Sequence, residues 1–317
     1  MNKLLLIIIS TFLLADCDNT PKAKRTHRLS PEGFISASLS PNFALVGNVN
    51  GYAEFWQLKP RQLIHTWQHT DEKNGVIYSA ISANEEYAIT AERESLAWWR
   101  VSDGTLMNVW YLPNIHSVSL SHDGKFALIG LKDKAIYYSL MHGKTKYAFP
   151  HEQIVTQADI KHDNNFAITG SADYSAKLWD LTTGNLVHTW QHNSKLSKVA
   201  TSPNGTYALT NEGLGTVRVW RTTSGRLYKQ LGNKLSTITA LAFSNDSTHV
   251  VLGHVASRIE QWNIKKGTRV NFWRPQKEDS WQPSASTPLA LSFTANNKGI
   301  YSITSNGYFQ LWQNTAK

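Results

Sequence analysis

The chain has 317 residues and a formal net charge of +9, from 32 Lys and Arg against 23 Asp and Glu. Its single cysteine excludes an intramolecular disulfide, and its many Trp, Tyr, Thr and Ser residues, interspersed with turn formers, favour short strands over helices. The basic balance leaves nucleic acid, anionic lipid and acidic protein as candidate partner classes.

The first 16 residues differ in kind from the rest. Asn2 and Lys3 precede the apolar run LLLIIISTFLLA, which is 12 residues long. A helix of that length is too short to cross a hydrocarbon core of about 30 Å. Residues 1–16 are therefore interpreted as an export signal and not as a membrane-spanning helix.

The end of this run, LLADC, resembles the processing site of bacterial lipoproteins through Leu14, Ala15 and Cys17. The resemblance implies cleavage before Cys17 and a lipid on that cysteine, which would hold the protein at a membrane surface without spanning it. Asp16 departs from the small residue usual before the cysteine. Its presence leaves an uncleaved anchor, or cleavage at a neighbouring bond, as alternatives.

Residues 17–23 are expected to form a short basic tether. Asp18 and Asn19 resemble the signal that keeps such lipoproteins in the inner membrane, so we expect the periplasmic face of that membrane rather than the outer membrane. Export argues against a nucleic-acid partner. The basic stretch PKAKRTHR, residues 21–28, is either attracted to anionic headgroups or simply a solvated part of the tether.

From residue 24 onward the chain repeats. The pentapeptide HTWQH occurs at 65–69 and 188–192, and its copies start 123 residues apart, three times 41. Seven key aromatic residues recur at intervals of 43, 39, 41, 41, 42 and 50: Trp56, Trp99, Tyr138, Trp179, Trp220, Trp262 and Trp312. Five of them are followed five residues later by a glycine that suits a tight hairpin turn: Gly104, Gly143, Gly184, Gly225 and Gly267.

Each repeat also predicts a pair of strands ahead of its key aromatic. Segments such as ASLSPNFALVG and VSLSHDGKFALIG show an alternating run, a polar turn and a second apolar run, which is typical of antiparallel strands. One repeat makes four short strands that cannot bury their own faces and must stack on copies of themselves. The sequence thus predicts an all-β fold, a monomeric seven-bladed propeller over residues 24–317.

The repeat resembles the WD40 family of β-propellers, most closely in FAITGSADYSAKLWDLTTG, residues 166–184, which contains the Trp-Asp pair. The resemblance implies a hydrogen-bonded tetrad of His151, Thr169, Asp173 and Trp179. Other repeats depart from it, because several lack the His and only Trp179 is followed by Asp. The tetrad is therefore expected in this repeat alone.

The last repeat ends shortly after its third strand, at FQLWQNTAK. Residues 24–30, KRTHRLS, precede the first inner strand and are positioned to supply the missing outer strand. A ring closed by this N-terminal strand would leave no unpaired edge to template aggregation. Closure would also keep Cys17 within a few residues of the ring.

The histidines of HTWQH have two interpretations. On a helix, His65 and His69 would share one face and could bind one metal ion. On a strand they lie about 13 Å apart, which is too far for a shared ion. A tetrad-like role for His69 and His192 is expected instead, and no metal or other cofactor is predicted.

No enzyme signature is recognisable in the sequence. Gly104 and Gly184 precede Trp110 and Trp190 by six residues, which does not match the repeats of quinone-dependent dehydrogenases. The segment DYSAKLW lacks the spacing and glycine of sialidase repeats. A central channel lined by Ser, Ala and Thr would favour a binding platform. A cluster of His, Asp, Glu or Arg there would favour an enzyme or a small-ligand sensor.

The longest interval between key aromatics contains RPQKEDSWQPSASTP, which would join the outer strand of one blade to the inner strand of the next. Trp281 in this polar insertion is either a candidate partner contact or folds back onto the ring as packing. The sequence favours a noncatalytic, lipid-anchored scaffold for an unidentified protein partner in the bacterial periplasm. The alternative is an enzyme or small-ligand sensor that uses the channel.

Overall fold

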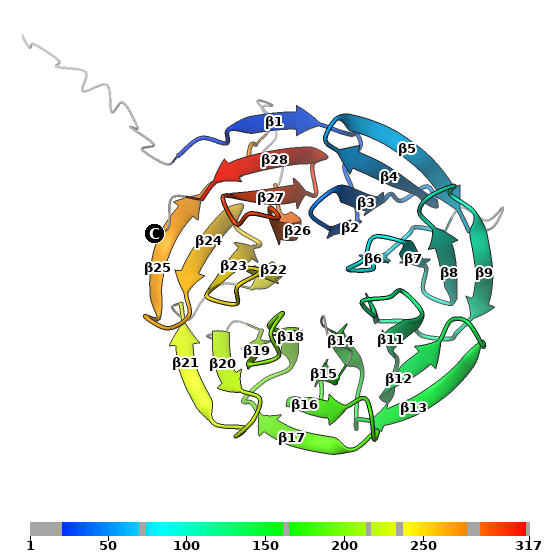
Figure 1. Ribbon diagram of the computed structural model, residues 1–317, viewed down its shortest axis with the longest axis vertical. Coiled ribbons are helices and arrows are strands. Elements are labelled where there is room, and N and C mark those ends of the chain that lie inside the picture. The colour runs from blue at the N-terminus through cyan, green and yellow to red at the C-terminus, as the bar shows by residue number, and fades with distance from the viewer. Residues whose placement is uncertain are drawn as a thin grey trace, which may run out of the picture.

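The computed structural model describes residues 21–69, 74–160, 165–213, 217–232, 237–277 and 286–314. Within these ranges the chain forms 28 strands and no helix, arranged as seven four-stranded antiparallel sheets around a central axis (Figure 1). The predicted all-β, seven-bladed propeller is confirmed. Since the described residues form strands and turns, no helix among them could cross a membrane.

Each blade has an inner strand beside the axis, a second strand, a third strand and an outer strand. The inner strands of blades 1 to 7 are β2 (Ser36–Leu39), β6 (Tyr78–Ile81), β10 (Ser117–Leu120), β14 (Val155–Ile160), β18 (Leu196–Thr201), β22 (Ile238–Phe243) and β26 (Pro288–Phe293). The second strands are β3 (Phe43–Gly47), β7 (Tyr87–Ala91), β11 (Phe126–Gly130), β15 (Phe166–Ser171), β19 (Tyr207–Glu212), β23 (His249–His254) and β27 (Gly299–Thr304). The third strands are β4 (Tyr52–Leu58), β8 (Ser95–Arg100), β12 (Lys134–Ser139), β16 (Ser175–Asp180), β20 (Val217–Arg221), β24 (Arg258–Asn263) and β28 (Tyr308–Gln313). The outer strands are β5 (Arg61–Gln68), β9 (Leu106–Tyr111), β13 (Lys144–Pro150), β17 (Leu186–Gln191), β21 (Leu227–Leu231), β25 (Thr268–Trp273) and, in blade 7, β1 (Arg25–Arg28).

The hairpin between the third and outer strands has the same irregularity in blades 1 to 6. The pairing register shifts directly before the key aromatic, as between Leu178 and Trp179 in blade 4. Such a bulge increases the local twist of the strand pair. The five predicted turn glycines follow, and all have φ between 60° and 78°, a region in which a side chain would be strained.

Because the strands of a blade alternate in direction, the connections fall on two faces of the ring. The loop face carries the loops from outer to inner strands and the turns between second and third strands. The turn face carries the turns between inner and second strands and those between third and outer strands. This sorting decides which residues can meet, since segments of different blades lie together only when they share a face.

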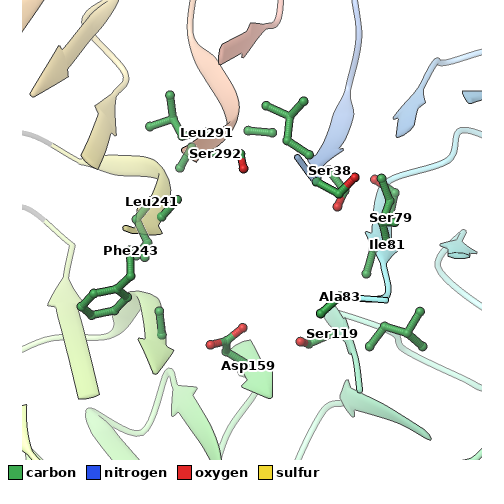
Figure 2. Close-up of a pocket in the computed structure, with 18 of the residues that line it drawn as sticks. Ser38, Ser79, Ile81, Ala83, Ser119, Asp159, Leu241, Phe243, Leu291 and Ser292 are labelled. Carbon is green, nitrogen blue, oxygen red and sulfur yellow. The ribbon is translucent and has the colours of Figure 1, made fainter. Parts of the chain in front are cut away.

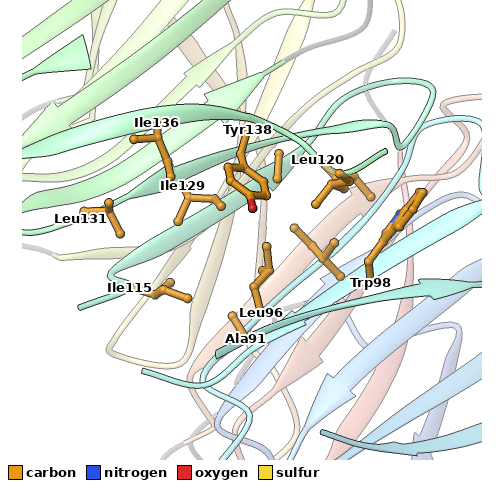
Figure 3. Close-up of a cluster of buried hydrophobic side chains, with 12 residues drawn as sticks. Ala91, Leu96, Trp98, Ile115, Leu120, Ile129, Leu131, Ile136 and Tyr138 are labelled. Atoms are coloured by element: carbon orange, nitrogen blue, oxygen red, sulfur yellow. The ribbon is translucent and has the colours of Figure 1, made fainter. Parts of the chain in front are cut away.

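The core lies between neighbouring blades, where the outer-strand aromatic of one blade contacts the key aromatic of the next. The ring centroids of Trp67 and Trp99 are 5.0 Å apart with nearly parallel planes, and those of Phe149 and Trp179 are 4.7 Å apart. Figure 3 shows the junction of blades 2 and 3, where Leu96 and Trp98 of blade 2 belong to one buried cluster with aliphatic side chains of blade 3. Burial of each large apolar side chain contributes about 1.5–3 kcal/mol, so stacking of blades stabilises the ring.

Strand β1 closes the ring as the sequence predicts. It pairs with β28 in antiparallel register, from Arg25 opposite Leu311 to Arg28 opposite Tyr308. Strands from the two ends of the described chain thus share one sheet, with β1 outermost (Figure 1). Blade 7 is complete, and no third strand of the described ring is left as a bare edge.

Candidate functional site

The four residues of the expected tetrad lie together in the structure. His151, directly after β13 of blade 3, places Nδ1 2.9 Å from Asp173 Oδ2 and Nε2 2.7 Å from Thr169 Oγ1. Trp179 Nε1 donates to the same Thr169 hydroxyl at 2.9 Å. The network therefore joins the end of one blade to the second and third strands of the next.

The pKa values of His151 and Asp173 in this network are both lowered, for different reasons. Desolvation lowers the pKa of His151, despite the opposing effect of Asp173. Burial raises the pKa of Asp173, but hydrogen bonds from Ser175, from the Glu152 backbone and from His151 outweigh it and lower the pKa to about 2. At neutral pH the pair is a neutral imidazole beside a carboxylate, and it links the end of blade 3 to blade 4.

Blade 2 contains a related network in which glutamate replaces aspartate. His69, directly after β5, contacts the Thr90 hydroxyl through Nε2 and lies 3.1 Å from Ser95 Oγ through Nδ1. Trp99 Nε1 donates to Thr90 at 2.8 Å, and Ser95 donates to Glu92 at 2.9 Å. The sequence pattern missed Glu92 because the family motif places Asp in this turn.

Blades 5 and 6 depart further from the motif. In blade 5, Arg218 donates to His192 Nδ1 at 2.6 Å and forms an ion pair with Glu212 at 2.9 Å. In blade 6, Glu260 accepts from Trp262 at 3.1 Å and pairs with an arginine of β25. Acidic residues near the turn between second and third strands give a sequence signal for Glu92 and Glu212. Glu260 lies within β24, two residues before the key aromatic, and Glu54 accepts from Trp56 at the same spacing in blade 1.

The first histidine of each HTWQH segment has a separate role. His65 Nε2 lies 2.8 Å from the Val101 carbonyl oxygen, and His188 Nε2 lies 2.8 Å from that of Thr222. Both contacts bridge an outer strand to the next blade. Within the described part of the chain, no group of three or more His, Cys, Asp or Glu is placed to hold a metal ion.

The inner strands enclose a cavity of about 380 Å³ along the axis. Its lining reaches residues of the turn face such as Pro41 and Asn245. Ser38, Ser119 and Ser292 surround the opening together with alanine and aliphatic side chains (Figure 2). This small-residue lining is the kind that favours a binding platform over an enzyme.

Two residues of opposite charge interrupt this lining. Asp159 on β14, which is directed into the opening in Figure 2, accepts hydrogen bonds from the Thr201 backbone and hydroxyl at 2.9 and 3.2 Å. Lys198 on β18 donates to Gln157 Oε1 at 3.1 Å, and burial lowers its pKa to about 8. The ammonium group of Lys198 remains mostly charged at neutral pH and is the feature of the channel best suited to a ligand.

The loop face exposes apolar side chains from several blades. They belong to blades 1, 2, 4 and 6 and are Ile35, Val49, Tyr111, Ile154, Tyr174 and Val255. Tyr111, at the end of β9, is 78% exposed. It borders a cavity of about 500 Å³ whose lining includes Asn74, Arg93 and Glu94.

Two sequence-predicted sites lie outside the described residues. They are Cys17, with the export signal before it, and Trp281 in the loop between β25 and β26. The ends of this loop are described, since β25 ends at Trp273 and β26 begins at Pro288. The loop therefore joins blades 6 and 7 on the loop face.

Comparison with known proteins supports the WD40 type of β-propeller. Residues 143–180 and 184–221 match the family model described as "WD domain, G-beta repeat". The chain is 26% identical over 158 residues to eukaryotic translation initiation factor 3 subunit I of Phaeosphaeria nodorum, covering 46% of this chain and 48% of that protein. It is 22% identical over 265 residues to autophagy-related protein 16 of Arabidopsis thaliana, covering 68% of this chain and 50% of that protein. The chain thus spans about half the length of these relatives.

Proposed function

We propose that this protein is a noncatalytic protein-binding scaffold. A lipid on Cys17 holds it at the periplasmic side of a bacterial membrane, and the inner membrane is favoured over the outer one. The observation that carries the scaffold role is the set of exposed apolar side chains on the loop face. Those of Tyr111 and Val255 are 78% and 50% exposed. These side chains lie outside the contacts that stack the blades, and exposed apolar and aromatic side chains supply anchors for partner contacts.

The path of the chain into the ring supports this arrangement. Arg25 at the start of β1 lies beside the β4–β5 turn, with which it lines one pocket, so the N-terminal segment enters the ring at the turn face. An anchor on Cys17 would bring that face toward the membrane and leave the loop face free. One relative is by its name a subunit of a larger factor, which agrees with a role in assembly.

Crosslinking in intact cells, followed by mass spectrometry, tests the scaffold role. We expect Tyr111→Ser combined with Val255→Ser to lose most of the crosslinked partner. The matched control is Leu106→Ser combined with Leu186→Ser, which removes apolar surface from exposed outer strands. Equal partner recovery from both variants would contradict a contact on the loop face.

Membrane fractionation tests the anchor. We expect Cys17→Ser to move the protein from the membrane fraction to the soluble periplasmic fraction, because a single apolar run of 12 residues is removed or too short to span. Retention of this variant in the membrane fraction would indicate an uncleaved anchor instead.

A second candidate function rests on Lys198 alone. An ammonium group at a cavity otherwise lined mostly by small and apolar side chains favours a small ligand with a carboxylate or other anionic group, although Asp159 in the same lining opposes an anion. Native mass spectrometry of the purified protein should then detect a bound small molecule that is absent from Lys198→Gln. If the unmodified protein shows only the mass of the chain without a ligand, and crosslinking recovers protein partners, the small-ligand function is rejected in favour of the scaffold.

A further inference from the structure

The junction that closes the ring breaks the rule followed by the other blade junctions. In each blade, one outer-strand residue lies opposite the third-strand position three residues before the key aromatic. At the first six junctions this residue is Trp67, Trp110, Phe149, Trp190, Leu231 or Trp273. In blade 7 it is His27, opposite Phe309. A titratable ring thus takes the place of an apolar side chain at the closing junction.

The neighbouring positions are also replaced, and by cations. Two residues earlier in the outer strand, other blades use His65, Tyr147 or His188 to pack on the turn glycine of the next blade. At the closing junction that position is Arg25. The facing turn carries Arg61 where five other blades have glycine. Arg25 and Arg61 therefore line one pocket at the place where three other junctions pack a ring on a glycine.

These residues surround a pocket of about 180 Å³. Its lining consists of Arg25, His27, Leu58, Lys59, Pro60, Arg61, Tyr301, Phe309 and Leu311. Among these described residues none is acidic. Lys59 Nζ lies 5.7 Å from the centre of the Tyr301 ring, which forms part of the apolar floor.

Charge and hydrogen bonding at the pocket are both out of balance. Arg25, Arg61 and His27 line the same pocket, and partial burial, followed by the charges of Arg61 and Arg25, lowers the pKa of His27. The buried Tyr301 hydroxyl has no hydrogen-bond partner among the described residues. The described lining of the pocket therefore carries positive charge without an acidic side chain to balance it.

We propose that this closing-junction pocket binds a phosphate-type anion, either free phosphate or the headgroup phosphate of a lipid. The anion bridges Arg25 on β1 and Arg61 on β5, and it thereby ties the closing strand to blade 1. Planar guanidinium groups bind phosphate oxygens in a bidentate manner, and such charge-assisted hydrogen bonds are the strong ones. The site is independent of the loop face and does not depend on the proposed partner.

Thermal unfolding of the full chain tests whether the anion stabilises closure. At constant ionic strength, inorganic phosphate should raise the Tm of the unmodified protein relative to chloride, because a ligand that binds only the folded state stabilises it. The variant Arg25→Gln with Arg61→Gln should show no phosphate response. Without phosphate it should unfold at the same or a higher temperature, because the repulsion is relieved. A variant that unfolds at a lower temperature in chloride, or still responds to phosphate, would overturn the proposal.

Isothermal titration calorimetry distinguishes free phosphate from a lipid headgroup as the ligand. The probes are inorganic phosphate, dihexanoyl phosphatidylglycerol below its micelle concentration, and the zwitterionic dihexanoyl phosphatidylcholine. Binding of inorganic phosphate alone assigns the site to free phosphate, and preferential binding of the anionic lipid assigns it to a headgroup. In either case Arg25→Gln with Arg61→Gln should weaken binding about tenfold or more, the loss of at least one charge-assisted bond.

The matched control removes two exposed positive charges from blade 3, as Lys132→Gln with Lys134→Gln. This variant should bind each probe within about twofold of the unmodified protein, a difference well under 1.4 kcal/mol. Equal weakening in the control would show that net charge, and not the pocket, attracts the anion. Absence of binding by any anionic probe would also refute the site.

Discussion

In the blade 4 network, the hydroxyl group of Thr169 contacts one ring nitrogen of His151 and the ring nitrogen of Trp179. It contacts His151 Nε2 at 2.7 Å and accepts from Trp179 Nε1 at 2.9 Å. His151 and Trp179 are both buried, so neither ring nitrogen can form a hydrogen bond to water if the hydroxyl is lost. Buried donors and acceptors without partners cost more than the net value of the bonds they made.

Replacement of Thr169 by Val should therefore destabilise the protein although it preserves shape. We expect the free energy of unfolding to fall by about 3 kcal/mol, from two buried ring nitrogens left unpaired. Urea denaturation followed by tryptophan fluorescence measures the loss. Thr189→Val, on the exposed side of β17 in the same blade, should change stability by less than about 0.5 kcal/mol. Similar losses in both variants would mean that the hydroxyl of Thr169 has no special role.

The buried histidines should make the ring sensitive to acid. Burial lowers the pKa of His69 to about 4, and burial together with Arg218 lowers that of His192 to about 4. The unfolded chain has histidines near pKa 6.5 and binds more protons than the folded ring between these values. Stability should thus be full above pH 6.5 and fall as the pH drops toward 4, by up to about 3 kcal/mol for each of these two residues.

Urea denaturation between pH 7.5 and 4.5 measures this slope. His69→Gln should be less stable at pH 7.5, because the contacts to Thr90 and Ser95 are altered, but it should lose less stability on acidification. His142→Gln, which changes an exposed histidine, should keep the slope of the unmodified protein. Parallel profiles for all three proteins would assign the acid sensitivity to other groups.

At the scale of the element, the hairpin between the third and outer strands is the most constrained unit. The bulge before the key aromatic turns the strand, and the glycine after it allows both a positive φ and the approach of the neighbouring blade. At Gly184, φ is +78°, and an added Cβ would lie 2.6 Å from the Tyr147 ring. Backbone conformation and packing between blades therefore select glycine together.

Gly184→Ala should destabilise the protein by about 2 kcal/mol, through backbone strain and displacement of the Tyr147 ring. Differential scanning calorimetry should detect a lowered Tm. Gly213→Ala is the control, because its Cβ would meet nothing closer than Ser194 Oγ at 3.7 Å. An unchanged Tm for Gly184→Ala would show that the hairpin can shift without cost.

For the whole molecule, the closing strand decides whether seven blades form one ring. Strand β1 supplies four residues of pairing to β28 and covers an edge that would otherwise be open. The other blades are each made from one continuous segment, so closure is the step that joins distant parts of the chain. Loss of the pairing between β1 and β28 should therefore lower the stability of the whole ring.

Deletion of residues 1–30 should lower the Tm and cause self-association in size-exclusion chromatography, because the β28 edge becomes available for pairing with another chain. Deletion of residues 1–20 retains β1 and should leave both properties unchanged. A monomeric, equally stable protein without β1 would mean that closure is supported by the stacking of blades alone.

The sequence by itself indicated the number of blades, the strand order within them, the closing strand and the four residues of the blade 4 network. The blades and their strands could be predicted because they are encoded by short spacings that recur in each repeat, such as a key aromatic and the glycine five residues after it. The closing strand followed from the missing outer strand of the last repeat, and the residues of the blade 4 network followed from the resemblance of that repeat to the WD40 family. Local patterns of this kind are read without knowledge of other blades.

Only the tertiary structure decided which residues of different repeats meet. The position of Lys198 in the channel, the apolar residues on the loop face and the shared pocket of Arg25 and Arg61 all depend on it. No sequence spacing relates these groups, because their distances are fixed by the register across bulges and by the closure of the ring. The repeats thus specify the fold, whereas the contacts made by residues that differ between repeats are known only once the blades are stacked.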